Sequence, residues 1–273
     1  MTASSQELHF ADAGEAADLA AFLARLIHYD RAAAVRLQAG GGVLAVFGRP
    51  PSFEVLAIRT ARLEAIVSTE AASAASDTSA GAGALDATVS AGEFADALDT
   101  ARAERTTDGS EGRVRGLVVP VPQAVTGPPW AGVLPPRGGW RRVNGLPGVD
   151  EVRGAVAAAV AEFRARDAAL PEEGRTRAER DRIGHEIWSR TLGDTGLPLR
   201  AVHAAQSLGF LRPVRAAAPA ATAHGSGVAT AAPEPLALLA AGGWLRLRTP
   251  YGSIAVRTSG VSSGLSGLSV TPA

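Results

Sequence analysis

Three stretches of this 273-residue chain contain almost no large apolar side chains, and they limit how the rest of it can fold. They span residues 68–84, 102–112 and 213–235 and consist mainly of Ala, Ser, Thr, Gly, Pro and charged residues. Such segments bury too little apolar surface to offset the entropy lost on ordering. We therefore predict three linkers, with packed structure between them.

The segment before the first linker predicts a helix followed by antiparallel strands. Within residues 12–30, Leu19, Phe22 and Leu26 recur at helical spacing and form one apolar face. Residues 34–63 then alternate short apolar runs with Gly- and Pro-containing turns, which is typical of β-hairpins. After the linker, Ser90 and Glu93 stand in capping-box register, which indicates a helix start behind a short strand.

The second half of the chain predicts helices that end in a hairpin. An apolar strand ends near Val121, and a long Pro- and Gly-rich loop runs from there to residue 148. Valines at helical spacing follow from Val149, and Pro171 opens a second, highly charged helix. A shorter helix at 199–208 and a hairpin at 244–258 complete the expected elements.

These elements together predict the α+β class, with antiparallel hairpins packed on amphipathic helices, a helical segment in the second half and a C-terminal β-hairpin. The expected organisation is an α+β domain at 1–148 with an insertion near 68–84, a helical segment at 149–212, an Ala/Pro-rich linker at 213–241 and a terminal hairpin with its tail at 242–273.

A short internal echo links two of the hairpins. Gly41-Gly42 and Gly242-Gly243 each precede an apolar strand, a Pro-containing turn and a returning strand that ends in Arg-Thr. Either two hairpins converged on the same turn chemistry, or one β unit was duplicated.

Charge and composition exclude several classes of protein. The 27 basic residues, all arginine, balance 27 acidic ones, which argues against a general nucleic-acid or membrane-surface binder. The chain has no cysteine, so disulfides, thiolate metal sites and thiol nucleophiles are excluded. Residues 1–12 lack a signal-peptide profile, and no apolar run approaches the ~20 residues that span a bilayer. We expect a cytoplasmic protein without a membrane partner.

No catalytic or metal-binding motif stands complete in the sequence. The G-x-S-x-G match at 260–264 lies in a Ser/Gly tail with no histidine after it. His185-Glu186 begins like a zinc-protease helix, but Ser189 stands where the second histidine is required. We therefore assign no catalytic residue, metal ligand or cofactor. Asp181, His185 and Glu186 remain the nearest group for an enzyme of unrecognised class, which is our third hypothesis.

The loop at 126–142 is the most unusual segment of the chain. Trp130 and Trp140 stand in a Pro- and Gly-rich stretch beside Arg137, Arg141 and Arg142. Rigid aromatic side chains flanked by arginine suit stacking, cation–π contacts or a protein interface. The alternative interpretation is that both tryptophans simply cover a sheet.

The terminal hairpin carries a row of arginines on one face. Leu245 and Leu247 alternate with Arg246 and Arg248, and Arg257 follows on the next strand. This alternation predicts a half-buried sheet whose outer face either keeps the protein soluble or binds a partner.

Two resemblances accompany these patterns. The order of expected elements from residue 7 to residue 98 resembles half of a sliding-clamp domain. The runs at 35–42, 126–132 and 245–252 resemble uncharacterised proteins of high-GC actinobacteria, whose coding bias also fits the Ala- and Arg-rich composition. Neither resemblance implies an activity.

Our leading hypothesis is a non-enzymatic binding or assembly protein that contacts a protein partner through the 126–142 loop. The alternative is a nucleic-acid-binding protein that uses the arginines of the loop and hairpin, whose binding would weaken with salt. The candidate binding residues are Trp130, Arg137, Trp140, Arg141, Arg142, Arg246, Arg248 and Arg257.

Overall fold

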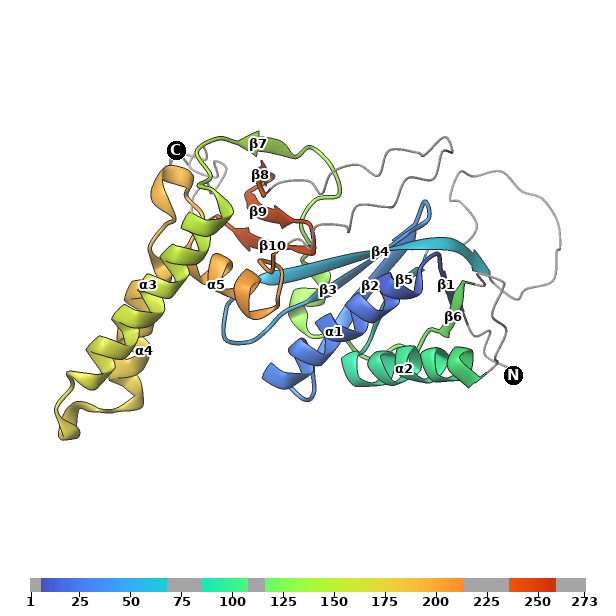
Figure 1. The fold of residues 1–273 in the computed structure, drawn as a ribbon, viewed down its shortest axis with the longest axis horizontal. Helices are drawn as coiled ribbons and strands as arrows, with labels where there is room; N and C mark the ends of the chain where they lie inside the picture. Colours follow the sequence, from blue (N-terminus) through green and yellow to red (C-terminus); the bar gives the residue numbers. More distant parts are fainter. Residues whose placement is uncertain (1–5, 68–84, 108–115, 214–235, 259–273) are drawn as a thin grey trace, which may run out of the picture.

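The computed structural model describes residues 6–67, 85–107, 116–213 and 236–258 (Figure 1). Runs of antiparallel strands and runs of helices follow one another along the chain, which confirms the α+β class and the C-terminal hairpin. Most of the three predicted linkers lies outside the described residues. No helix within the described ranges has the length and apolar character needed to cross a membrane.

The described strands form one antiparallel sheet. Eight strands follow the order β5-β2-β3-β4-β10-β9-β8-β7, and β1 pairs with both β4 and β6 beside this path. The bounds are β1 (Glu7–Phe10), β2 (Ala34–Gly40), β3 (Val43–Gly48), β4 (Leu56–Val67), β5 (Leu85–Ser90), β6 (Leu117–Pro120), β7 (Arg141–Val143), β8 (Ala237–Ala241), β9 (Trp244–Thr249) and β10 (Gly252–Arg257).

Two three-stranded meanders make up the centre of this sheet, and their last strands join them. The meanders β2-β3-β4 and β8-β9-β10 meet where β4 pairs antiparallel with β10, with Ile58 opposite Ser253. Each meander makes its first turn through two glycines at positive φ, 59° and 75° at Gly41 and Gly42, and 51° and 76° at Gly242 and Gly243. The sequence echo thus reflects a shared two-residue turn that glycine adopts without steric cost. Duplication of one unit stays a prediction.

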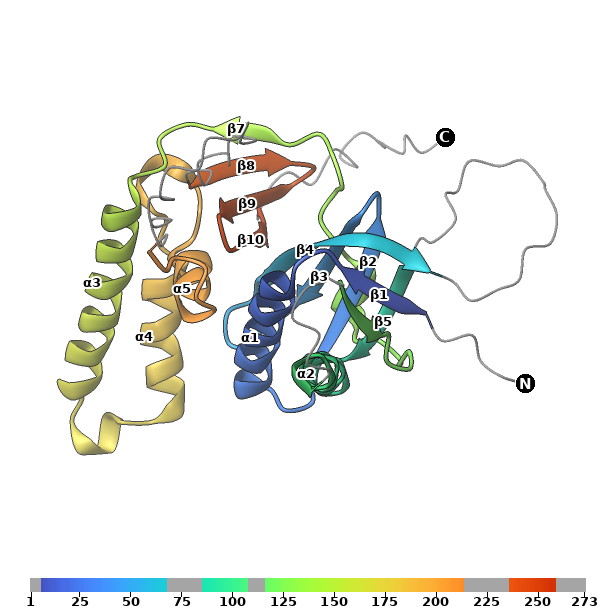
Figure 2. The ribbon, with the colours of Figure 1, turned by 45° about the vertical axis from the view of Figure 1, so that its right-hand side comes forward.

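The helices lie on one side of the sheet (Figures 1 and 2). Helices α1 and α2 pack against each other beside the first meander. Helix α5 packs on β10, and the antiparallel helices α3 and α4 both pack on α5. Asp12 caps α1 as its oxygen accepts from the Gly14 amide at 2.8 Å, in line with the predicted helix at 12–30. The bounds are α1 (Ala13–Tyr29), α2 (Ala91–Thr107), α3 (Val149–Ala168), α4 (Arg177–Ser189) and α5 (Leu199–Ser207).

One apolar core runs through both halves of the chain. Buried side chains of α1 and of α3 to α5 belong to one cluster with those that both meanders turn toward the helices. Phe22 of α1 stacks on Phe210 behind α5, with 5.7 Å between the ring centroids. The helical segment therefore shares its core with the N-terminal sheet.

Three boundaries differ from the sequence predictions. Helix α2 continues to Thr107 through the first part of the predicted linker at 102–112. Ala, Arg and Glu in this part are strong helix formers, and they extend a helix that Phe94 and Leu98 anchor in the core. Helix α4 starts behind Thr176, whose hydroxyl accepts from the Glu179 amide at 3.2 Å, and Pro171 opens only a short 3-10 turn. Strand β8 occupies residues 237–241, inside the predicted linker at 213–241, because pairing with β9 gives this short Ala/Leu run hydrogen-bond partners.

Candidate functional site

The face of the sheet opposite the helices, which we call the open face, carries a small apolar cluster of its own. Its buried members come from β3, β4, β9 and β10. The segment between β6 and β7 packs on this cluster through Leu134 and two tryptophans. The cluster consists of Phe47, Leu56, Ile58, Trp244 and Ala255.

The predicted tryptophans of the loop lie half-buried against the open face. Trp130 belongs to a 3-10 turn, and Trp140 donates its indole N–H to the carbonyl of Pro136 at 3.0 Å. The guanidinium of Arg246 lies 5.7 Å from the centroid of the Trp140 ring. This placement is what the sheet-covering interpretation expects, while a contact with a partner stays a prediction.

The predicted arginines divide into separate groups. Arg137, Arg141 and Arg142 of the loop are exposed, and Arg142 sits opposite Leu239 where β7 pairs with β8. Arg257 lies at the end of β10, with its guanidinium 5.5 Å from the centroid of the Trp244 ring. Arg246 and Arg248 of β9 line a hollow that Arg59 and Arg62 of β4 also line.

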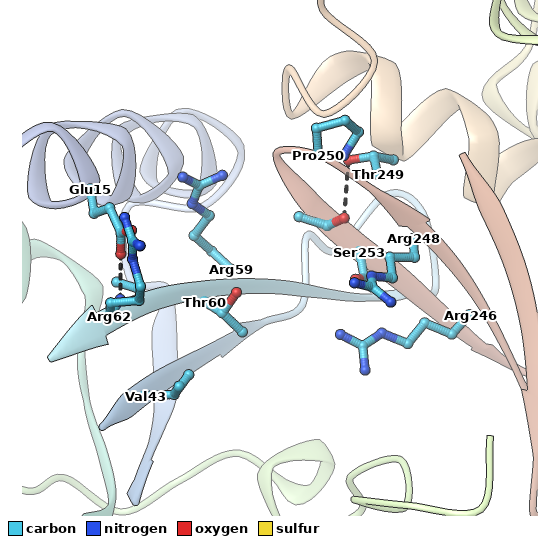
Figure 3. A pocket seen from close by; sticks show the side chains of 12 residues that line it. Glu15, Val43, Arg59, Thr60, Arg62, Arg246, Arg248, Thr249, Pro250 and Ser253 are labelled. Carbon is cyan, nitrogen blue, oxygen red and sulfur yellow. Dashed lines mark hydrogen bonds and ion pairs between the residues drawn. The ribbon is translucent and has the colours of Figure 1, made fainter. Parts of the chain in front are cut away.

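The hollow that these arginines line, which we call the arginine pocket, has a volume of about 440 Å³ and opens where β4 and β10 separate (Figure 3). The registered pairing of β10 with β4 ends at Ile58–Ser253, and β4 continues from there to its pairing with β1. Figure 3 shows Arg246 extending from β9 into the space between β9 and β4. The lining residues include Glu15, Arg59, Thr60, Arg62, Arg246, Arg248, Thr249 and Ser253.

Two of these arginines already have carboxylate partners on α1. Arg62 donates from Nε to Glu15 at 2.7 Å, and Arg59 donates from Nη2 to Asp18 at 2.9 Å. Arg59 is nearly buried, and burial lowers its pKa while the charge of Asp18 raises it. The second guanidinium nitrogen of Arg59 donates to the carbonyl of Tyr251, which ties β4 to the β9–β10 turn.

Arg246 differs from these two arginines. Its Nε atom is buried and has no hydrogen-bond partner among the described residues. Burial lowers the pKa of Arg246, and the positive charge of Arg248 lowers it further. A buried cationic donor without a partner is costly, so this arrangement favours an anion in the pocket.

Hydroxyl groups complete the lining of the arginine pocket. Thr60 and Ser253 stand on β4 and β10, while Thr249 donates to the carbonyl of Gly252 at 3.0 Å and closes the turn (Figure 3). Arginine N–H groups and hydroxyls are the donors that phosphate and carboxylate oxygens accept from.

Sequence reasoning singled out Arg246 and Arg248 but missed Arg59, Arg62 and Glu15. A signal for Arg59 was present, because it occupies an inward position between Ala57 and Ala61, two otherwise buried positions of β4. A charged residue at such a position needs a partner in the core. That arginines of β4 and β9 line one hollow depends on contacts between distant segments and has no local signal.

The group considered for an enzyme does not converge. Asp181 and His185 line a different hollow, beside α4 and α5. Glu186 bonds instead to Arg166 at 2.9 Å and to Arg190 at 3.3 Å. Within the described ranges, no three His, Asp or Glu side chains are placed to hold a metal ion.

That second hollow contains a histidine packed between aromatic rings. His203 stacks on Trp188 with 4.3 Å between ring centroids and meets Phe53 edge-on at 5.2 Å. Burial lowers the pKa of His203 below its ordinary value of 6.5. The folded protein therefore holds this imidazole neutral over a range of pH in which the unfolded chain protonates it.

We expect His203 to make the protein less stable in mild acid. Because the unfolded state binds the additional proton, the free energy of unfolding falls as the pH drops below about 6.5. The variant His203→Gln should show a smaller fall between pH 7.5 and pH 5.5 than the parent protein in urea unfolding. Parallel pH profiles of the two proteins would contradict the burial of a neutral imidazole.

Two family models match successive parts of the chain. A domain of unknown function (DUF8010) matches residues 3–132, and a second domain of unknown function (DUF8185) matches residues 135–261. Searches of curated proteins and of solved structures gave no significant match. The family matches meet inside the loop that precedes Trp140, whereas the sequence-based division placed a boundary at 148. That division and the sliding-clamp likeness stay predictions.

Proposed function

We propose that this protein is a non-enzymatic binding protein whose arginine pocket holds a phosphate-bearing ligand. The observation that carries the proposal is Arg246, which lines a hollow shared with Arg59, Arg62 and Arg248 and whose buried Nε has no hydrogen-bond partner among the described residues. Arg59 is paired with Asp18 and Arg62 with Glu15, while Arg246 forms no ion pair within the described part of the chain. A guanidinium group without a carboxylate partner favours an anion with several oxygens.

The ligand class follows from the donors. Thr60 of β4 and Ser253 of β10 add hydroxyls to the lining beside the arginines. A tetrahedral phosphoryl group can accept from several directions at once, while a carboxylate accepts in one plane. A small phosphorylated compound fits a hollow of about 440 Å³. The alternative ligand is a nucleic-acid strand, whose backbone phosphates would contact Arg246 and Arg248.

A second candidate function is a protein contact through the loop at 126–142. Val125 and Val133 flank Trp130 and are 41% and 45% exposed, so the loop presents apolar side chains outward although its tryptophans face the sheet. A protein partner would cover these valines together with the exposed arginines of the loop.

The proposal predicts that pyrophosphate binds the purified protein and that binding depends on Arg246. Titration calorimetry at low salt should show one site, and Arg246→Gln should weaken it by about tenfold or more, because a charge-assisted contact is lost. Arg177→Gln is the matched control, since Arg177 is 95% exposed on α4. Thermal unfolding of both variants checks that each remains folded.

Parallel titrations separate the two sources of phosphate. A single-stranded oligonucleotide that binds far more tightly than pyrophosphate, with steep weakening in salt, would identify nucleic acid as the ligand. If neither compound binds, or if Arg246→Gln and Arg177→Gln change the affinity equally, the arginine pocket is not a phosphate site.

A further inference from the structure

A third hollow, of about 440 Å³, which we call the tryptophan pocket, lies at the opposite end of the β4–β10 junction from the arginine pocket. The arginine pocket forms where β4 passes the second turn of the β8-β9-β10 meander. The tryptophan pocket forms where β10 passes the second turn of the β2-β3-β4 meander, around Glu54. Both hollows therefore arise from the same arrangement of two antiparallel meanders.

The walls of the tryptophan pocket are apolar and aromatic. Trp130 lies on one side and Trp244 on another, with Leu56 and Ala255 from the open-face cluster between the strands. Val133 adds an exposed apolar side chain at the rim. Tryptophan presents a large, rigid surface on which a planar ring can stack.

The rim of the same pocket is cationic. Arg49, Arg200 and Arg257 line it, and Glu54 is the one acid among the described lining residues. The Nε atom of Arg200 is buried without a hydrogen-bond partner, and its ion pair with Glu54 is long, at 4.0 Å. Arg49 and Arg257 form no ion pair within the described part of the chain. The rim thus offers guanidinium groups that carboxylates do not neutralise.

The turn that shapes this pocket holds an unfavourable backbone conformation. Glu54 has φ 53°, the one positive value among the described residues other than glycine. Such a conformation costs free energy for a residue with a Cβ and persists where the surrounding structure enforces it, which occurs often at binding sites. Here it directs the chain into β4 directly beside Arg200 and the pocket.

We propose that the tryptophan pocket binds a planar aromatic molecule that carries one anionic group. The ring packs among Trp130, Trp244 and Leu56, and the anion accepts hydrogen bonds from Arg200, with Arg49 and Arg257 close by. This site is separate from the arginine pocket and does not depend on the function proposed for it. An aromatic carboxylate and a nucleoside monophosphate both provide this chemistry.

Four probes test the proposal on the full-length protein. Indole-3-acetate and adenosine monophosphate carry the ring and the anion, while indole and adenosine carry the ring alone. Tryptophan fluorescence and titration calorimetry should show at least one of the acids binding about tenfold or more tightly than its neutral counterpart. The acid that binds identifies whether the anion is a carboxylate or a phosphate.

Two exposed arginines supply variants that should remain folded. Arg49→Gln and Arg257→Gln should each reduce the preference for the acid several-fold, while Arg137→Gln, an exposed loop arginine outside the pocket, should leave it unchanged. Arg246→Gln in the arginine pocket should also leave it unchanged. Equal affinity for acid and neutral probes, no binding by any probe, or loss of binding in Arg246→Gln alone would overturn the proposal.

Discussion

Replacing Asp18 with alanine is expected to lower the free energy of unfolding by about 2–3 kcal/mol, although the residue belongs to a helix surface. Asp18 accepts from Arg59 at 2.9 Å and from Arg212 at 2.8 Å with its two carboxylate oxygens. Removal of the carboxylate leaves the nearly buried Arg59 beside the like charge of Arg212. We place the loss below that of a fully buried pair because the Asp18 side chain is 35% exposed.

The position of Asp18 explains why the effect extends beyond one ion pair. Arg212 also lies over the ring of Tyr251, with its guanidinium carbon 3.9 Å from the ring centroid. Asp18 thereby links α1, β4, the segment after α5 and the β9–β10 turn. Its loss should loosen the packing of the two halves against each other.

Urea unfolding measures this prediction. Asp181→Ala is the matched control, because Asp181 is a helical aspartate that is 71% exposed, and it should change stability by no more than about 0.5 kcal/mol. Asp18→Asn should lie between the parent protein and Asp18→Ala, since the amide oxygen can still accept one hydrogen bond. Equal stability of Asp18→Ala and Asp181→Ala would show that the bridge contributes nothing.

Replacing Gly252 with alanine is expected to destabilise the protein by about 3 kcal/mol or more. Gly252 has φ 153°, a conformation that residues with a Cβ rarely adopt. A Cβ atom there would lie 2.6 Å from the Cζ atom of Phe210 and 2.9 Å from the backbone oxygen of Ile58. The backbone oxygen cannot move away without disturbing the pairing of β4 with β10.

Gly154→Ala is a control that should change the stability in the opposite direction. Gly154 is an exposed glycine in α3, and a Cβ atom there would meet nothing within 4 Å. Because alanine has the higher helix propensity, this variant should be more stable by about 0.5–1 kcal/mol. In thermal unfolding, the midpoint temperature of Gly252→Ala should therefore lie below that of the parent protein, and the midpoint of Gly154→Ala above it. A Gly252→Ala protein as stable as the parent would contradict the close approach of Phe210 to the β9–β10 turn.

Local features of the fold could be predicted from the sequence because a few neighbouring residues decide them. The apolar spacing of Leu19, Phe22 and Leu26 defined α1, and Ser90 stands at the start of α2 with its hydroxyl 3.4 Å from the Glu93 amide. The Gly-Gly pairs marked both hairpin turns at positive φ. In each case the signal and the structure lie within one or two turns of chain.

Elements whose stability comes from distant partners escaped prediction. Strand β8 consists only of Ala and Leu, so its sequence gives no strand signal. It forms because β9 and β7 pair with it. The loop tryptophans could be recognised as unusual, but only the packed structure shows that they rest on the open-face cluster. Their neighbours on that cluster come from strands that are far away in the sequence.

The two pockets show the same division most clearly. The sequence by itself determined the α+β class, the turns and the row of arginines on the terminal hairpin. It could not determine that Arg246 lines the same hollow as Arg59 and Arg62, because β9 and β4 are separated by more than 170 residues, and only the pairing of β10 with β4 brings the two strands into one sheet. Secondary structure follows from short-range backbone and side-chain preferences, whereas a binding site requires side chains that only tertiary packing can place around one hollow.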